Sequence, residues 1–100
     1  MKDILEGYLN YIAIRKSHHT KRAYRNDLLQ FIGYLPAIEH PSQITPKHID
    51  DFISVLGLSK TTLARKLASI SSFFTYLKRQ GIVQSNPVDD IERIRVRKRY

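Results

Sequence analysis

Apolar residues recur at helical spacing in four segments of this chain, and no segment shows the strict alternation that is typical of a β-strand. Spacings of three and four residues put such side chains on one face of a helix, which can then be buried. The expected core residues are Ile4, Leu5, Tyr8, Leu9, Ile12, Tyr24, Leu28, Phe31, Leu35, Ile49, Phe52, Ile53, Leu56, Leu63, Leu67, Ile70, Phe74 and Leu77. This pattern predicts an all-α fold, a compact bundle of four main helices with a short extra C-terminal helical turn and a basic tail.

Capping residues indicate where the helices begin and end. The expected helices cover residues 2–16, 18–35, 46–56, 60–80 and 87–93, with a loop over 36–45. The residues expected at their N-caps are Ser17, Thr45, Ser59 and Asn86. Pro46 and Pro87 fit the first helical position, where no backbone N–H is needed. Gly57 and Gly81 fit helix C-termini, because glycine readily adopts a left-handed conformation.

The chain is strongly basic, and its charges are segregated. It has 100 residues, the size of one domain, with 17 lysines and arginines against 9 aspartates and glutamates, which gives a formal net charge of +8. Residues 15–25 hold five cations and no acid, and no acid lies between Asp51 and Asp89. A basic face indicates a polyanionic partner: DNA, RNA or an anionic membrane. We favour nucleic acid, because the strongest apolar stripes are needed for the core and leave little to bind a membrane.

Two helix starts carry the same signature. Residues 17–22 and 59–66 each begin with serine and continue with hydroxyls and cations, without a carboxylate. A helix N-terminus presents unpaired backbone N–H groups and the positive end of the dipole, so hydroxyls and cations there favour phosphate. A cationic stripe follows on the second helix, at positions i, i+3, i+4 and i+7: His18, Lys21, Arg22 and Arg25. We therefore expect a helical module that grips a nucleic-acid backbone at two places.

No catalytic or metal-binding constellation is expected. The chain has no cysteine, and adjacent histidines such as His18 and His19 point about 100° apart on a helix, so they do not form a joint metal site. The pairs Asp50-Asp51 and Asp89-Asp90 lie in or near first helical turns, where acids favour the dipole. We expect no cofactor and no metal. With no apolar run near the ~20 residues of a membrane span, and an N-terminus unlike a signal peptide, we expect a cytoplasmic protein.

Several motifs recur in the order and spacing of one known family. They are Tyr8-Leu9, Ser17-x-x-Thr20-x-x-x-Tyr24-x-x-Asp27-Leu28-x-x-Phe31-x-x-Tyr34-Leu35, Ile44-Thr45-x-x-x-Ile49-x-x-Phe52-Ile53, Ser59-x-x-Thr62-x-x-Arg65-x-Leu67-Ala68-x-Ile70-x-x-Phe73-Phe74-x-Tyr76-Leu77, and Gly81 with Asn86-Pro87 and Ile91. Together they resemble the N-terminal core-binding domain of tyrosine recombinases of the phage-integrase type, including Xer-like resolvases. The resemblance covers nearly the whole chain.

This resemblance implies a SAM-like helical bundle whose second and fourth helices face duplex DNA around the major groove. In that family a basic linker joins the bundle to a C-terminal catalytic domain, and the two clamp DNA from opposite sides. We therefore expect residues 1–92 to be the core-binding domain and residues 93–100 to begin the linker. The implied partners are double-stranded DNA, the catalytic domain and other recombinase protomers in a synaptic complex.

The residues expected to bind DNA come from three arguments. The resemblance carries over Ser17, Thr20, Tyr24, Ser59, Thr62 and Arg65. Charge and helical face add Lys21, Arg25, Lys60 and Lys66. The third argument adds three residues. His18 and Thr61 contribute an imidazole and a hydroxyl to the helix starts, and Ser69 is a small residue that lets a DNA backbone approach closely. Arg65 is the best candidate for base readout, because arginine can bond guanine at two points.

No segment matches the family's catalytic domain, which carries its arginines, histidine and nucleophilic tyrosine, and no matching motif surrounds Tyr100. We therefore expect a chain without the catalytic domain, which is not itself an enzyme. The alternative is a helical protein-interaction module or a truncated regulator of a recombinase. Such a protein would contact another protein through its helix faces and bind DNA weakly.

Overall fold

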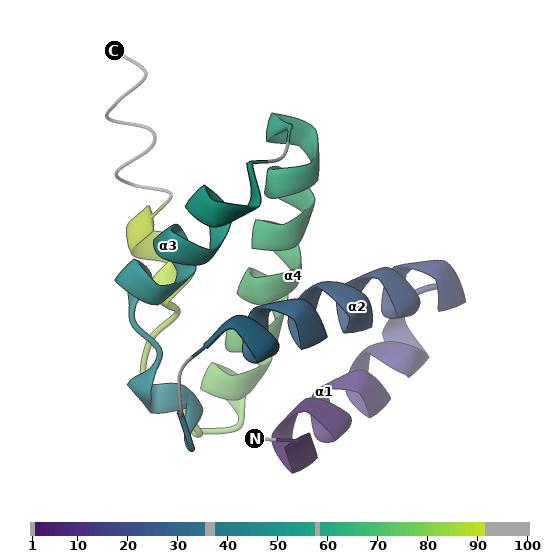
Figure 1. Cartoon of the computed structure of the whole chain (residues 1–100). Helices are drawn as coiled ribbons and strands as arrows, with labels where there is room; N and C mark the ends of the chain where they lie inside the picture. The colour runs from purple at the N-terminus through teal and green to yellow at the C-terminus, as the bar shows by residue number, and fades with distance from the viewer. Residues whose placement is uncertain (1, 36–37, 58, 92–100) are drawn as a thin grey trace.

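Four main helices form the fold in the computed structural model of the chain, which describes residues 2–35, 38–57 and 59–91 (Figure 1). The helices are α1 (Lys2–Arg15), α2 (His18–Tyr34), α3 (Pro46–Leu56) and α4 (Lys60–Arg79), and a short 3-10 helix, η1 (Pro41–Gln43), lies between α2 and α3. Residues 87–91 form a further helical segment, and the described residues contain no strand. The predicted all-α class is confirmed. The predicted tail, 93–100, lies outside the described residues.

Local capping sets the bounds of α3, as predicted. The Thr45 hydroxyl accepts a hydrogen bond from the His48 N–H, and Nδ1 of His48 accepts one from the Thr45 N–H. This reciprocal pair is a capping box, in which histidine takes the place of the usual glutamate or glutamine. At the other end Gly57 adopts a left-handed conformation with a φ of 57°, which glycine does without strain.

The end of α4 has the hydrogen bonds of a Schellman motif. The Ile82 N–H donates to the Leu77 carbonyl at 2.9 Å, and the Gly81 N–H donates to the Lys78 carbonyl at 3.1 Å. Gly81 has a φ of 76° and lies one position beyond the cap residue, Gln80. Gly81 therefore lies at the end of α4 as predicted, but the cap residue itself is Gln80, one position before the glycine.

One hydrophobic core joins all the helices. Its buried side chains are Leu5, Tyr8, Leu9, Ile12, Leu28, Phe31, Leu35, Ile44, Ile49, Phe52, Ile53, Leu67, Ile70, Phe73, Phe74, Leu77, Val83, Val88 and Ile91. Four predicted core residues are only partly buried and pack against its edge: Ile4, Tyr24, Leu56 and Leu63. Tyr8 of α1 meets Phe73 of α4 edge-on, with ring centroids 5.3 Å apart, and Phe31 of α2 meets Phe52 of α3 at 5.2 Å. These aromatic contacts fix how the helices pack.

The arrangement of α2 and α4 positions the site. α2 lies across the middle of α4, and the N-terminal ends of the two helices point away from this crossing in different directions (Figure 1). α1 packs against both helices. None of the described helices has the length and apolar character that crossing a bilayer requires.

Candidate nucleic-acid interface

The two predicted helix starts fold in the same way. Ser17, the N-cap of α2, has φ −64° and ψ 159°, and its hydroxyl accepts the Thr20 N–H at 3.2 Å. Ser59, the N-cap of α4, has φ −62° and ψ 157°, and its hydroxyl accepts the Thr62 N–H at 3.4 Å. In each pair the two hydroxyls also bond to each other, at 3.0 and 3.1 Å. Neither first turn holds an acid, so each helix N-terminus keeps its positive character.

The cationic stripe of α2 lies beside the first of these helix starts. His18, Arg22 and Arg25 are exposed and Lys21 is half-buried. The four side chains line a surface hollow of about 290 Å³. Among the residues that the structure describes, none of the three cations Lys21, Arg22 and Arg25 contacts a carboxylate. Their charge is therefore available to a polyanion.

A buried carboxylate joins α2 to α4 behind this surface. Asp27 of α2 is only 2% exposed, and its Oδ1 accepts hydrogen bonds from Lys66 Nζ at 2.9 Å and from Arg65 Nη2 at 3.1 Å. Its Oδ2 accepts the Ser69 hydroxyl at 2.9 Å. Lys66 also donates to Gln30 Oε1 at 2.7 Å. Every polar atom of the Asp27 carboxylate thus has a partner on α4.

These partners set the charge state of Asp27. Burial by itself raises the pKa of a carboxyl group, but the hydrogen bonds from Lys66, Ser69 and Arg65 outweigh it and hold the pKa of Asp27 below its ordinary value of 3.8. Asp27 is therefore ionised at neutral pH, and it carries its charge inside the crossing of the two helices.

The crossing limits how far apart the N-termini of α2 and α4 can lie. Asp27 lies nine residues beyond the start of α2, about 14 Å along the helix, and Lys66 lies six residues beyond the start of α4, about 9 Å. Because Asp27 and Lys66 touch, both helix N-termini extend from a single point of contact. Arg65 lies at this point with 55% of its side chain exposed.

The predicted DNA-binding residues fall into three groups by exposure. The exposed ones are Ser17, His18, Arg25, Ser59, Lys60, Thr61 and Arg65. The half-buried ones are Thr20, Lys21, Tyr24 and Thr62. Lys66 and Ser69 are buried at 7% and 0% exposure. Their polar groups are used on Asp27 and Gln30, so the structure brings these two residues into the helix crossing and the others to the surface.

Sequence reasoning missed Asp27 as a site residue, although a signal was present. Asp27 follows Tyr24 by three positions and precedes Phe31 by four, so it lies on the apolar face of α2. In the same way Lys66 lies on the apolar face of α4, four residues before Ile70. A charge on an apolar face is buried only when it is paired, so one acid and one cation on two such faces indicate an ion pair.

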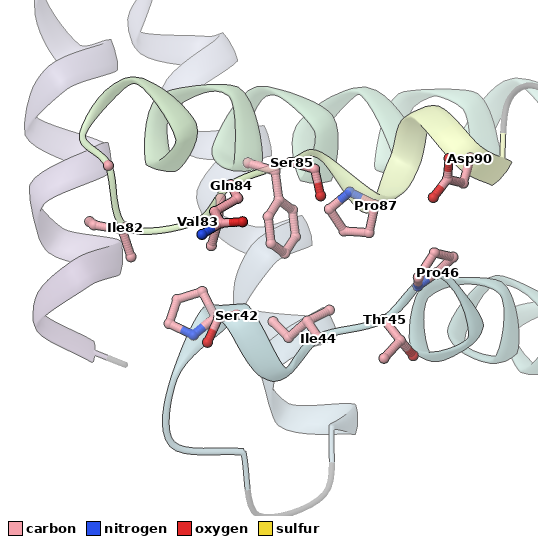
Figure 2. A pocket seen from close by; sticks show the side chains of 13 residues that line it. Ser42, Ile44, Thr45, Pro46, Ile82, Val83, Gln84, Ser85, Pro87 and Asp90 are labelled. Atoms are coloured by element: carbon pink, nitrogen blue, oxygen red, sulfur yellow. The ribbon is translucent and has the colours of Figure 1, made fainter.

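Two further hollows lie elsewhere on the surface. One, of about 470 Å³, runs between α1 and α4, and its cationic lining residues are Arg15, Lys16 and Arg79. The other, of about 430 Å³, separates the start of α3 from residues 81–90 (Figure 2). The only ionisable side chain among its lining residues is Asp90, so this hollow does not suit a polyanion. Within the described residues, no three of the histidine, aspartate and glutamate side chains gather as metal ligands do.

Known proteins resemble this chain over most of its length. The family model described as "Phage integrase, N-terminal SAM-like domain" matches residues 5–81. Tyrosine recombinase XerC of Thermodesulfovibrio yellowstonii is 38% identical over 99 residues, which cover 94% of this chain and 32% of that protein. A tyrosine recombinase of Pseudothermotoga lettingae is 36% identical over 109 residues, which cover 99% of this chain and 37% of that protein. The chain spans about a third of the length of these curated relatives. No solved structure matches it.

Proposed function

Because this chain belongs to the phage integrase N-terminal SAM-like domain family, we propose that it binds duplex DNA with the N-terminal halves of α2 and α4, as the core-binding part of a site-specific tyrosine recombinase. The repeated helix start carries this function. Two N-termini with the same serine–threonine geometry and no acid in the first turn extend from one crossing, and a helix N-terminus of this kind suits a phosphate.

The proposed contacts divide into two kinds. The exposed Arg25 and Lys60 and the half-buried Lys21 supply salt-dependent affinity for phosphates, together with the two capped N-termini. Arg65 lies at the crossing of the two helices with 55% of its side chain exposed, which supports a role in reading a base edge. We leave Lys66 and Ser69 out of the contact set, because their polar groups are already bonded within the helix crossing.

The names of the relatives support the partners that we propose. These relatives are named tyrosine recombinases, and this chain matches about a third of their length. We propose that it acts in the cytoplasm beside a catalytic domain and other protomers of such a recombinase. Alone it should bind DNA weakly, since linking two binding modules raises affinity well beyond that of either one.

An NMR titration of the labelled chain with a short mixed-sequence duplex, at two salt concentrations, tests this function. We expect shifts in residues 17–25 and 59–65 that weaken as salt rises. Arg25→Ala should lower the slope of log affinity against log salt by about one, because one phosphate contact is lost. Lys78→Ala removes an equal charge from the exposed last turn of α4 and is the matched control, with an unchanged slope.

The alternative of a protein-interaction module predicts a different result. No shifts at low salt, or shifts spread over the whole surface, would contradict the two-helix contact with DNA. Equal effects of Arg25→Ala and Lys78→Ala would show that only the net charge of +8 matters, and would contradict the assignment of the contact to α2.

A further inference from the structure

The Asp27 carboxylate holds two cations, although one is enough to balance it. Lys66 lies within 2.9 Å of Oδ1 and its side chain is 9% exposed, so it neutralises the buried charge. Arg65 bonds the same oxygen at 3.1 Å, but 55% of its side chain is exposed. The charge of Arg65 therefore remains exposed to solvent. The cluster of Asp27, Lys66 and Arg65 has a net positive charge, which lies at the surface on Arg65.

Arg65 uses only part of its bonding capacity on Asp27. A guanidinium has five N–H donors in a planar fork, and the hydrogen bond to Asp27 comes from Nη2. A free arginine side chain loses rotational entropy when a ligand immobilises it, and this loss weakens binding. An arginine already held by a buried carboxylate has lost part of that freedom before the ligand arrives.

We propose that Asp27 is a positioning residue, which fixes the guanidinium of Arg65 so that its remaining donors meet DNA at the crossing of α2 and α4. This inference rests on the proposed function and deepens it. Lys66 acts separately, because it balances the charge of Asp27 and ties it to Gln30, so that the carboxylate stays ionised and keeps its bond to Arg65.

The proposal is tested by a double-mutant cycle, measured by titration of a short mixed-sequence DNA duplex into the whole chain. The variants are Asp27→Asn, Arg65→Ala and the two combined. We expect Asp27→Asn to weaken binding about three- to tenfold when Arg65 is present, and to have no effect when Arg65 is alanine. Equal weakening in both backgrounds would mean that Asp27 acts on the fold as a whole and would overturn the proposal.

A second measurement uses the wild-type chain alone, so it needs neither a folded variant nor DNA. NMR relaxation of the arginine Nε–H groups in the wild-type chain compares Arg65 with Arg22 and Arg25, which are also exposed but contact no carboxylate among the described residues. We expect Arg65 to be the most rigid of the three. Equal mobility would overturn the proposal, whatever the DNA titration shows.

The control variant is Gln30→Ala, which removes the second partner of Lys66 and leaves the bond between Asp27 and Arg65 in place. It should bind DNA as the wild type does. If Arg65→Ala leaves the affinity unchanged while Arg65 is rigid, the contact assigned to Arg65 under the proposed function is wrong. If Arg65→Ala weakens binding and Asp27→Asn does not, only the positioning role of Asp27 is wrong.

Discussion

The Tyr8 hydroxyl donates a hydrogen bond of 2.8 Å to the Ser72 hydroxyl, across 64 positions of the chain. Tyr8 is fully buried, and its ring packs edge-on against Phe73 and Tyr76. α1 is thereby tied to α4, the helix whose N-terminal half we assign to DNA. The position of the first helix depends on this polar contact as well as on apolar packing, since a buried hydroxyl without a partner is costly.

Tyr8→Phe should lower the free energy of unfolding by about 1 kcal/mol, because it removes one hydrogen bond and leaves the ring in place. Chemical denaturation measures this change. Tyr76→Phe, at a partly buried tyrosine on the edge of the core, is the matched control and should cost less. A loss of stability that is equal in the two variants would contradict the assigned bond.

Tyr8 also predicts a loss of stability at high pH. Burial raises the pKa of Tyr8 from 10.0 to about 12, and the hydrogen bond with Ser72 only partly offsets this. The unfolded chain releases the proton at the lower pKa, so this contribution to stability is complete below pH 10 and is lost as the pH rises toward 12. Phenylalanine has no proton to release, so the free energy of unfolding of Tyr8→Phe should fall less between pH 10 and pH 12 than that of the wild type. Identical pH profiles would refute this.

Lys66→Met should destabilise the chain by about 3 kcal/mol, since it leaves the buried Asp27 with only the exposed Arg65 and a hydroxyl to compensate it. Thermal or chemical unfolding measures the loss. Replacing both partners, Asp27→Leu with Lys66→Met, should recover much of it, because an apolar pair of similar volume avoids the desolvation of both charges. A double variant less stable than either single one would rule out this account of the ion pair.

Acid should weaken the fold through Asp27. Its pKa lies below 3.8 in the folded chain because three donors bond the ionised carboxylate, in spite of its burial. The lowered pKa contributes stability that is complete above the ordinary pKa and is lost as the pH falls through the folded value. Unfolding free energies measured from neutral pH downward should therefore decline below about pH 4. In Asp27→Asn this part of the decline should be missing.

Leu67→Ala should lower the free energy of unfolding by about 2–5 kcal/mol, because Leu67 is 6% exposed and faces the core from α4. Leu29→Ala, at a leucine of α2 that is 39% exposed, is the matched control and should cost under about 1 kcal/mol. Two equal melting temperatures would mean that the register of α4 is not the one described.

The sequence by itself determined the four main helices and most of their ends, whereas η1 lies within the segment that was predicted to be a loop. Ser17, Thr45 and Ser59 cap the helices that they were predicted to cap, and Gly57 ends α3. These features are local: a cap bonds a backbone N–H three positions away, and glycine permits a left-handed turn at its own position. The apolar stripes are local as well, because a helical period places their side chains on one face before any partner helix is present.

Only the tertiary structure decided which polar residues of those helices face the surface and which face each other. Lys66 and Ser69 have the residue types of a DNA contact, yet they bond Asp27, 39 and 42 positions away in the chain. A lysine favours whichever anion the packing brings to it, and no local rule selects between a phosphate and a carboxylate on another helix. The crossing of α2 over α4 decides between them. Burial of both apolar faces brings Asp27, on the apolar face of α2, against Lys66, on the apolar face of α4.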